Sequence, residues 1–91
     1  MGMTSALMTL DAVTRLETII LIELLCACQA LDCDWDPPGR GVAELHSAVR
    51  ALVAKLDADR PPADDVDALR LLLDTRRLDD VLARVREGAA V

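Results

Sequence analysis

The chain has 91 residues and a net charge of −6, and its composition is 53 % hydrophobic with no Tyr, no Phe and a single Trp. This length allows one domain or part of one, and the dominance of Leu, Ala and Val predicts an all-α fold. The negative charge opposes phosphate backbones and anionic membrane surfaces, so neither nucleic acid nor a membrane is expected as a partner.

The first predicted helix covers residues 4–32, because no Pro or Gly interrupts this range and Thr4 or Ser5 can cap its N-terminus. At 1.5 Å per residue it is about 40 Å long, so its ends should protrude from so small a domain. Its second half holds the run 19–31, which is apolar or small except at Glu23 and Gln29. A helix that is apolar on all sides belongs inside a bundle, and this run falls short of the ~20 apolar residues that span a bilayer.

The core and interface of the protein are therefore expected along this run. A chain of this length folded alone hides only about 60 to 65 % of its unfolded surface, so the helix needs copies of itself or another chain around it. The predicted fold is one long buried helix followed by three shorter helices, as part of a multi-chain helical bundle. The side chains assigned to the core or interface are Ile19, Ile20, Ile22, Glu23, Leu24, Leu25, Ala27 and Leu31.

Glu23 is the one charged residue in the run, and burial of an unpaired carboxylate is costly. No cation lies one helical turn away on either side. A structural ion pair is therefore favoured over a functional acid, with Arg50 of this chain or an Arg of a neighbouring subunit as the partner in the assembled state.

The segment 33–41 predicts a turn, since it contains Pro37 and Pro38 and is rich in Gly. Trp35 in this turn is flanked by acidic residues and is interpreted as a loop anchor or an interface residue. The second helix should cover 42–58, where apolar residues recur at helical spacing. His46 lies at the edge of that apolar stripe, and its isolation from other ligand residues favours a packed or hydrogen-bonded structural role over catalysis.

Two further helices are predicted after Pro61 and Pro62. The third covers 65–74 with Asp64 as its N-cap, and the fourth covers 76–87 with Thr75 as a candidate cap and Gly88 as its end. The four helices together form a single helical segment over residues 1–91.

The cysteines Cys26, Cys28 and Cys33 are interpreted as small buried hydrophobic residues. Cys26 and Cys28 lie about 200° apart on a helix, so they can neither pair with each other nor bind one metal ion. The first cation is Arg15 and the apolar run comes late, unlike a secretory signal, so we expect a cytoplasmic protein with reduced thiols. No P-loop, glycine fingerprint, zinc spacing or nucleophile elbow is present, and no catalytic, cofactor-binding or metal-binding residue is assigned.

The sequence IELLCACQALD, from Ile22 to Asp32, resembles the helix near the C-terminus of the aromatic amino acid ammonia-lyases. This family comprises the histidine, phenylalanine and tyrosine ammonia-lyases and related aminomutases. Met1-Gly2 resembles the end of the family's His-Val-Ser-Met-Gly stretch, and LHSAVR at 45–50 resembles its next helix. DRPPADDVD at 59–67 is similar to the family's Asp-Arg-Pro-Leu-x-x-Asp-Ile segment. The resemblance covers residues 1–73.

This resemblance implies an enzyme that eliminates ammonia with a methylidene-imidazolone (MIO) electrophile made from an internal Ala-Ser-Gly, with a Tyr as base, in tetramers built around long parallel helices. The present chain contains neither Ala-Ser-Gly nor any Tyr, so no catalytic group carries over to it. For this chain the resemblance implies a scaffold role, and the MIO electrophile is expected in a partner chain. The start at Met1, just after the position of the family's active-site stretch, suggests a natural or engineered split of a lyase into two chains, or a truncated remnant of one.

Two classes of function follow. In the first, this chain is the C-terminal scaffold subunit or fragment of an ammonia-lyase or aminomutase and is inactive alone, completing the helical core and oligomer interface of a larger catalytic chain. In the second, it is a non-catalytic helical module that self-associates through the same surface. The residues do not distinguish among histidine, phenylalanine and tyrosine as substrates, nor between elimination and amino migration.

Overall fold

The computed structural model describes residues 2–34 and 36–89, with the side chain of residue 89 excepted. This part of the chain forms four α-helices and no strand: α1 (Gly2–Asp32), α2 (Arg40–Arg50), α3 (Ala63–Asp74) and α4 (Arg77–Ala89). The all-α fold predicted from composition is confirmed. Trp35 lies outside the described residues, so its interpretation as an anchor stays a prediction.

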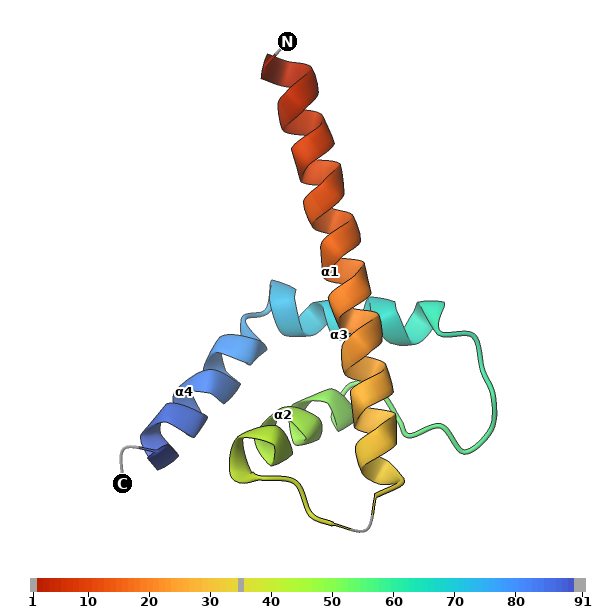
Figure 1. Cartoon of the computed structure of the whole chain (residues 1–91), viewed down its shortest axis with the longest axis vertical. Coiled ribbons are helices and arrows are strands. Elements are labelled where there is room, and N and C mark those ends of the chain that lie inside the picture. Colours follow the sequence, from red (N-terminus) through yellow and green to blue (C-terminus); the bar gives the residue numbers. More distant parts are fainter. Residues whose placement is uncertain (1, 35, 90–91) are drawn as a thin grey trace.

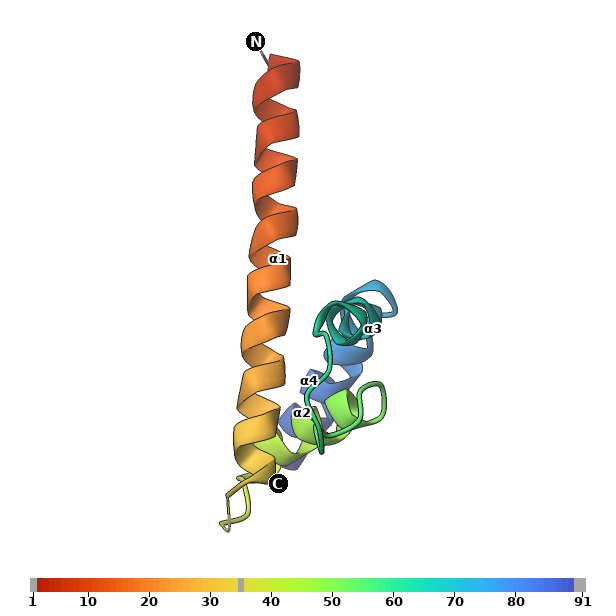
Figure 2. The same cartoon turned by 90° about the vertical axis from the view of Figure 1, so that its right-hand side faces the viewer.

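Helix α1 dominates the shape of the molecule. Its 31 residues span about 46 Å, and α2, α3 and α4 gather on one side of its C-terminal half while its N-terminal half projects alone (Figure 1, Figure 2). The radius of gyration is 15.7 Å, whereas a compact domain of this length has about 12 Å. The predicted protrusion of the long helix is therefore confirmed at its N-terminal end.

The hydrophobic core lies between the C-terminal half of α1, α2 and α3, which crosses α1 transversely (Figure 1). Its buried members are Leu21, Cys28, Val49, Val53, Val66, Leu69 and Leu72. Helix α4 packs against α2 and α3 and buries Val81. The core is small: α1 contributes two of these residues, α3 three and α2 only Val49, while Val53 comes from the loop after α2.

Two predicted N-terminal caps are wrong. Helix α1 already includes Thr4 and Ser5, and the Ser5 carbonyl accepts a hydrogen bond from the Thr9 hydroxyl at 2.9 Å. Helix α3 begins at Ala63 after Pro62, whose carbonyl accepts the Val66 N–H at 3.0 Å. Asp64 thus lies inside the first turn of α3, where its negative charge still interacts favourably with the helix dipole.

The junction of α3 and α4 also differs from the prediction. The Thr75 hydroxyl donates to the Leu71 carbonyl, so Thr75 belongs to the end of α3 and does not cap α4. Arg76 follows with φ 57°, in the left-handed region where glycine is usual, and α4 begins at the next residue. Helix α4 continues through Gly88 to Ala89.

Helix α2 ends at Arg50, eight residues before the predicted end of the helix 42–58, and residues 51–62 form a loop. Side chains from outside α2 bind carbonyls of this loop. Arg60 donates to the Ala54 carbonyl at 2.5 Å, and Gln29 donates to the Leu56 carbonyl at 3.3 Å. The bond from Gln29 crosses from α1 and the bond from Arg60 lies within the loop; together they supply partners for backbone groups of a segment whose sequence has helical periodicity.

Candidate functional site

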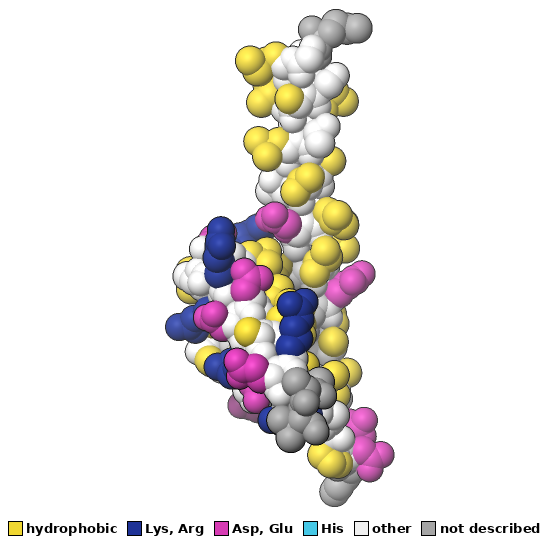
Figure 3. Space-filling model, turned by 90° about the vertical axis from the view of Figure 1, so that its left-hand side faces the viewer, with side chains coloured by type: hydrophobic (Ala, Val, Ile, Leu, Met, Phe, Trp, Pro, Cys, Tyr) yellow, Lys and Arg dark blue, Asp and Glu magenta, His cyan; other side chains and the backbone are white. Residues whose placement is uncertain are grey.

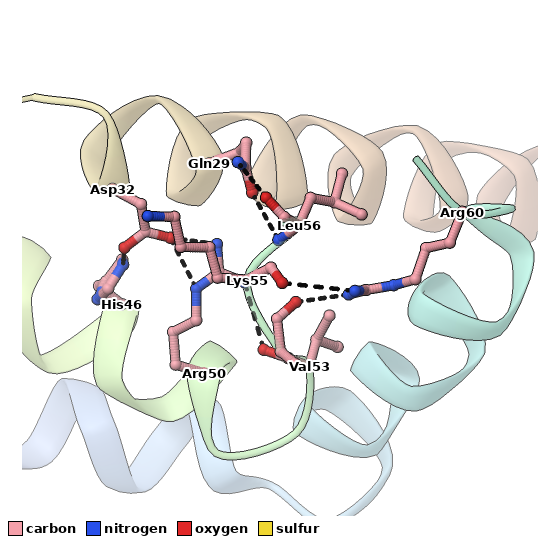
Figure 4. A network of polar contacts seen from close by, with 9 residues as sticks. Gln29, Asp32, His46, Arg50, Val53, Lys55, Leu56 and Arg60 are labelled. Carbon is pink, nitrogen blue, oxygen red and sulfur yellow. Dashed lines mark hydrogen bonds and ion pairs between the residues drawn. The ribbon is translucent and has the colours of Figure 1, made fainter. Parts of the chain in front are cut away.

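Asp32, the last residue of α1, joins α1 to α2 through a polar cluster (Figure 4). His46 Nε2 lies 2.8 Å from Asp32 Oδ1, and Arg50 Nε donates to Asp32 Oδ2 at 2.9 Å. The three side chains are 16 to 23 % exposed, so water screens these contacts only in part. Asp32, His46 and Arg50 are called the Asp32 cluster below.

The Asp32 cluster stabilises the charged form of its carboxylate. Burial alone would raise the pKa of Asp32, but the hydrogen bonds from Arg50 and His46 and the charges of these residues outweigh burial and hold the pKa below its ordinary value. The neighbouring Cys28 behaves differently, because burial raises the pKa of its thiol and keeps it protonated. A neutral buried thiol is a poor nucleophile, so Cys28 acts as a core residue.

The cluster confirms one interpretation and corrects another. His46 is hydrogen-bonded, as predicted, although its partner Asp32 was not foreseen because the two residues lie on different helices. Arg50, suggested as a partner for Glu23, binds Asp32 instead. Glu23 is exposed and takes part in no ion pair among the described residues. Its pairing with an Arg of another chain stays a prediction.

Gln29 fixes the loop 51–62 to α1 one turn before the Asp32 cluster. Its side-chain amide accepts the Leu56 N–H at 3.2 Å and donates to the Leu56 carbonyl at 3.3 Å (Figure 4). The sequence showed Gln29 only as an interruption of an apolar run. Its spacing of three from Asp32 places both side chains toward the same side of α1, where they hold the loop and α2.

Helix α1 carries two apolar surfaces that this chain leaves uncovered. The first is the N-terminal stripe, made of Met3, Leu7 and Leu10, which are 60 to 76 % exposed. Met3 precedes the buried Leu21 by 18 residues, or five helical turns, and Leu10 precedes Cys28 by the same interval. The stripe therefore continues the face of α1 that α2 and α3 cover farther down, and Figure 3 shows hydrophobic side chains along the projecting half of α1.

The second surface, called the open face of α1, lies opposite the core. Leu16 and Ile19 form its centre and Ile20 and Ile22 its two flanks; these side chains are 44 to 55 % exposed, and Ile22 also borders the pocket described below. Ile19 and the buried Leu21 differ by two positions and so point about 200° apart. The predicted interface residues Ile19, Ile20, Ile22, Glu23 and Ala27 are all exposed in the single chain, while Leu24, Leu25 and Leu31 are half-buried. Cover of the exposed ones by another chain stays a prediction.

A pocket of about 720 Å³ lies between α1, the loop 51–62 and α3. Its walls include Ile22, Leu25, Leu56, Val66 and Pro62. The arginines at its rim are engaged within the chain, since Arg50 binds Asp32, Arg60 lies 3.0 Å from Asp65, and Arg70 lies 3.8 Å from Glu17. The pocket is thus suited to apolar side chains and not to an anion.

Two further features of the described part of the chain concern metal ligands and membrane-spanning helices. Residues 2–34 and 36–89 contain no group of three metal-ligating side chains, and Cys26 and Cys33 are exposed free thiols, contrary to their interpretation as buried residues. No helix within these ranges is both long and apolar enough to cross a bilayer.

The lowered pKa of Asp32 predicts an acid-sensitive fold. A depressed carboxyl pKa stabilises the folded state above the unfolded value of about 3.9, and this contribution is lost as the pH falls through the folded-state pKa. We therefore expect the difference in melting temperature between the wild type and Asp32→Asn to be largest near pH 7 and to shrink as the pH falls below 4. A pH-independent difference in thermal melts would contradict the stabilised carboxylate.

Comparison with known proteins gives a consistent set of relatives. The family model described as aromatic amino acid lyase matches residues 1–51. The chain is 41 % identical over 75 residues to the histidine ammonia-lyase of Anaeromyxobacter sp. (strain K), which aligns 81 % of this chain with 15 % of that protein. It is 36 % identical over 91 residues to the histidine ammonia-lyase of Myxococcus xanthus (strain DK1622), covering 99 % of this chain and 17 % of that protein.

A third relative is the probable histidine ammonia-lyase of Thermoplasma volcanium, which is 35 % identical over 78 residues, covering 86 % of this chain and 16 % of that protein. The chain thus spans only 15 to 17 % of the length of these relatives. No solved structure matches the chain.

Proposed function

The chain belongs to the aromatic amino acid lyase family, and from this premise we propose that it is a C-terminal scaffold segment that completes the helical core of a larger catalytic lyase chain. The observation that supports the proposal is the N-terminal stripe of α1. Leu7 and Leu10 continue a face that is already core lower down, yet residues 2–16 are exposed along their whole length. A soluble protein seldom leaves such a stripe open, because contiguous apolar surface favours association.

We place the reacting groups of the assembly in the larger chain. An MIO electrophile requires an Ala-Ser-Gly, which this sequence lacks, and the chain has no Tyr to serve as the base. The residues also do not fit a site for that group, because the described buried side-chain polar atoms are all hydrogen-bonded and the arginines around the large pocket are paired. No step of an elimination is assigned to this chain.

Histidine is the proposed substrate of the assembled enzyme, since the relatives compared above are named histidine ammonia-lyases. The contribution of this chain is to position other helices. The Asp32 cluster and Gln29 fix α2 and the loop 51–62 to the lower half of α1, which leaves the upper half free to enter a bundle.

Copurification tests the proposal. The histidine ammonia-lyase of Anaeromyxobacter sp. (strain K), shortened by the segment that aligns with this chain, is coexpressed with the tagged chain, and the removed segment supplied as a separate chain is the positive control. We expect the tagged chain to retain the shortened lyase. Leu7→Asp should abolish retention, because it places a charge in the N-terminal stripe, whereas Thr9→Asp on another side of α1 should not. Retention by the removed segment and not by this chain would contradict the scaffold role.

A further inference from the structure

The pocket between α1, the loop 51–62 and α3 has two free thiols in its wall. Cys26 and Cys33 both line it, and both are exposed. Cys33 lies one residue beyond α1, but its N–H donates to the Ala30 carbonyl at 3.1 Å, so the backbone still follows a helical turn there. Seven residues make almost two full turns, so the two thiols leave the backbone toward the same side, about 10 Å apart along the axis. At this spacing they cannot form a disulfide with each other, and each remains available to a ligand.

The third cysteine, Cys28, provides a contrast on the same helix. It belongs to the hydrophobic core and is 2 % exposed, and burial raises the pKa of its thiol. Because the thiolate is the reactive form of cysteine and needs access to its reagent, Cys28 stays inert in the folded chain. The reactive sulfur atoms of this protein are therefore the two that open into the pocket.

The walls around these thiols suit an apolar small molecule. The pocket volume of about 720 Å³ lies within the range of small-molecule binding sites. Ile22 lies one helical turn before Cys26, while the loop adds Leu56 and α3 adds Val66. A ligand of this pocket thus touches hydrophobic side chains from three segments while it lies beside a thiol.

Charged ligands find no free partner in the same pocket. Arg60 lies 3.0 Å from Asp65, and Arg70 donates a hydrogen bond to the Thr18 hydroxyl. Asp67 also lines the pocket and is exposed, so it repels an anion. The lining arginines in turn repel a cation. The electrostatics therefore select an uncharged ligand.

We propose that this pocket is a binding and modification site for uncharged, apolar α,β-unsaturated carbonyl compounds, which bind against its walls and alkylate Cys26 and Cys33. The thiol releases its proton to water, and the thiolate sulfur bonds to the β-carbon of the compound. The electron pair of the carbon–carbon π bond moves to the α-carbon, which takes a proton from water. This addition needs no oxidant or reductant. Binding holds the electrophile beside the sulfur, so it reacts faster than the same electrophile in free solution.

Two maleimides with the same reacting ring test the proposal. N-Phenylmaleimide is uncharged and apolar, whereas N-carboxyethylmaleimide carries a carboxylate. Of the three cysteines, Cys33→Ser leaves only Cys26 exposed and Cys26→Ser leaves only Cys33 exposed, so the mass of the intact chain reports each thiol separately. The matched control combines both substitutions with Ala27→Cys, which places a thiol at an exposed position of the same helix turn that does not line the pocket.

The measured quantity is the ratio of the two alkylation rates, apolar reagent over charged reagent. We expect this ratio to be at least about tenfold larger at Cys26 and at Cys33 than at the control thiol. The control accounts for the general repulsion between a chain of net charge −6 and the carboxylate reagent. N-Phenylsuccinimide, which has the same shape but no reactive double bond, should slow alkylation at Cys26 and leave the control thiol unchanged. Cys28 should gain no adduct while the chain stays folded.

Ala30→Phe tests the role of the pocket itself. Ala30 lines the pocket and is exposed, so an aromatic ring at this position should occupy the space beside Cys26. The rate ratio at Cys26 should then fall to that of the control thiol, with circular dichroism to show that the helices are kept. Equal ratios at the pocket thiols and the control thiol, no protection by N-phenylsuccinimide, or an unchanged ratio in Ala30→Phe would overturn the proposal.

The alkylation site does not rest on the proposed scaffold role. Every measurement uses the chain alone, and none of the substituted residues belongs to the N-terminal stripe. Retention of the shortened lyase chain without selective alkylation would leave the scaffold role standing and the pocket proposal wrong. Selective alkylation without retention would give the opposite result.

Discussion

Replacing Asp32 with Ala should destabilise the fold by about 2 to 4 kcal/mol, because it leaves Arg50 and His46 largely buried without their shared acceptor. The figure is kept below that for a fully buried pair, since these side chains retain some exposure to water. For a chain of this size, each kcal/mol corresponds to about 4 to 8 °C, so the melting temperature should fall by roughly 10 to 25 °C.

Asp11→Ala is the matched control for this prediction. It makes the same substitution in the same helix but removes only an exposed ion pair, so its effect should stay within about 0.5 kcal/mol. All proteins are melted at one concentration, because self-association makes the melting temperature depend on concentration. Equal melting temperatures for the two variants would show that the Asp32 cluster does not hold α1 to α2.

The second large effect concerns activity. The purified chain alone should release no ammonia from histidine, since it contains no Ala-Ser-Gly from which the electrophile could form. Together with the shortened histidine ammonia-lyase it should restore urocanate formation, which the shortened enzyme alone should lack. The measurement is the ultraviolet absorbance of urocanate, followed for each chain separately and for the mixture.

Two results would count against that prediction. Urocanate formed by rigorously purified chain alone would mean that its own residues carry the chemistry. A mixture that copurifies but forms no urocanate, while the removed segment of the relative restores activity, would mean that this chain binds without completing the enzyme.

The features of the fold that depend on local chemistry could be predicted from the sequence. Helix α1 ends at Asp32 as predicted, because Pro37 and Pro38 exclude helix soon afterwards, although α2 begins at Arg40 and so takes in Gly41, which was predicted to lie in the turn. The absence of Pro and Gly between residues 4 and 32 likewise predicted a helix too long for a compact domain. Such signals act within a few residues and require no knowledge of the rest of the fold.

The features that depend on contacts between distant segments could not be predicted from the sequence. Periodicity favoured a helix to residue 58, but Gln29 on α1 exchanges hydrogen bonds with the backbone of Leu56 and so holds the chain in a loop after Arg50. Similarly, the partner of Arg50 is Asp32, and nothing in the spacing of 18 residues distinguishes this carboxylate from Glu23. Such pairings exist only once the turn at 33–39 has brought α2 back against α1.

The central claim is that the projecting half of α1 is completed by another chain. Hydrogen exchange of the backbone amides in residues 2–16 measures this directly, in the chain alone and in its complex with the shortened histidine ammonia-lyase. A helix half without tertiary contacts opens at little free-energy cost, so these amides should exchange rapidly in the chain alone. In the complex they should slow by at least about a hundredfold, to rates like those around Leu21 and Cys28. Equal, rapid exchange of residues 2–16 with and without the bound lyase chain would contradict the account.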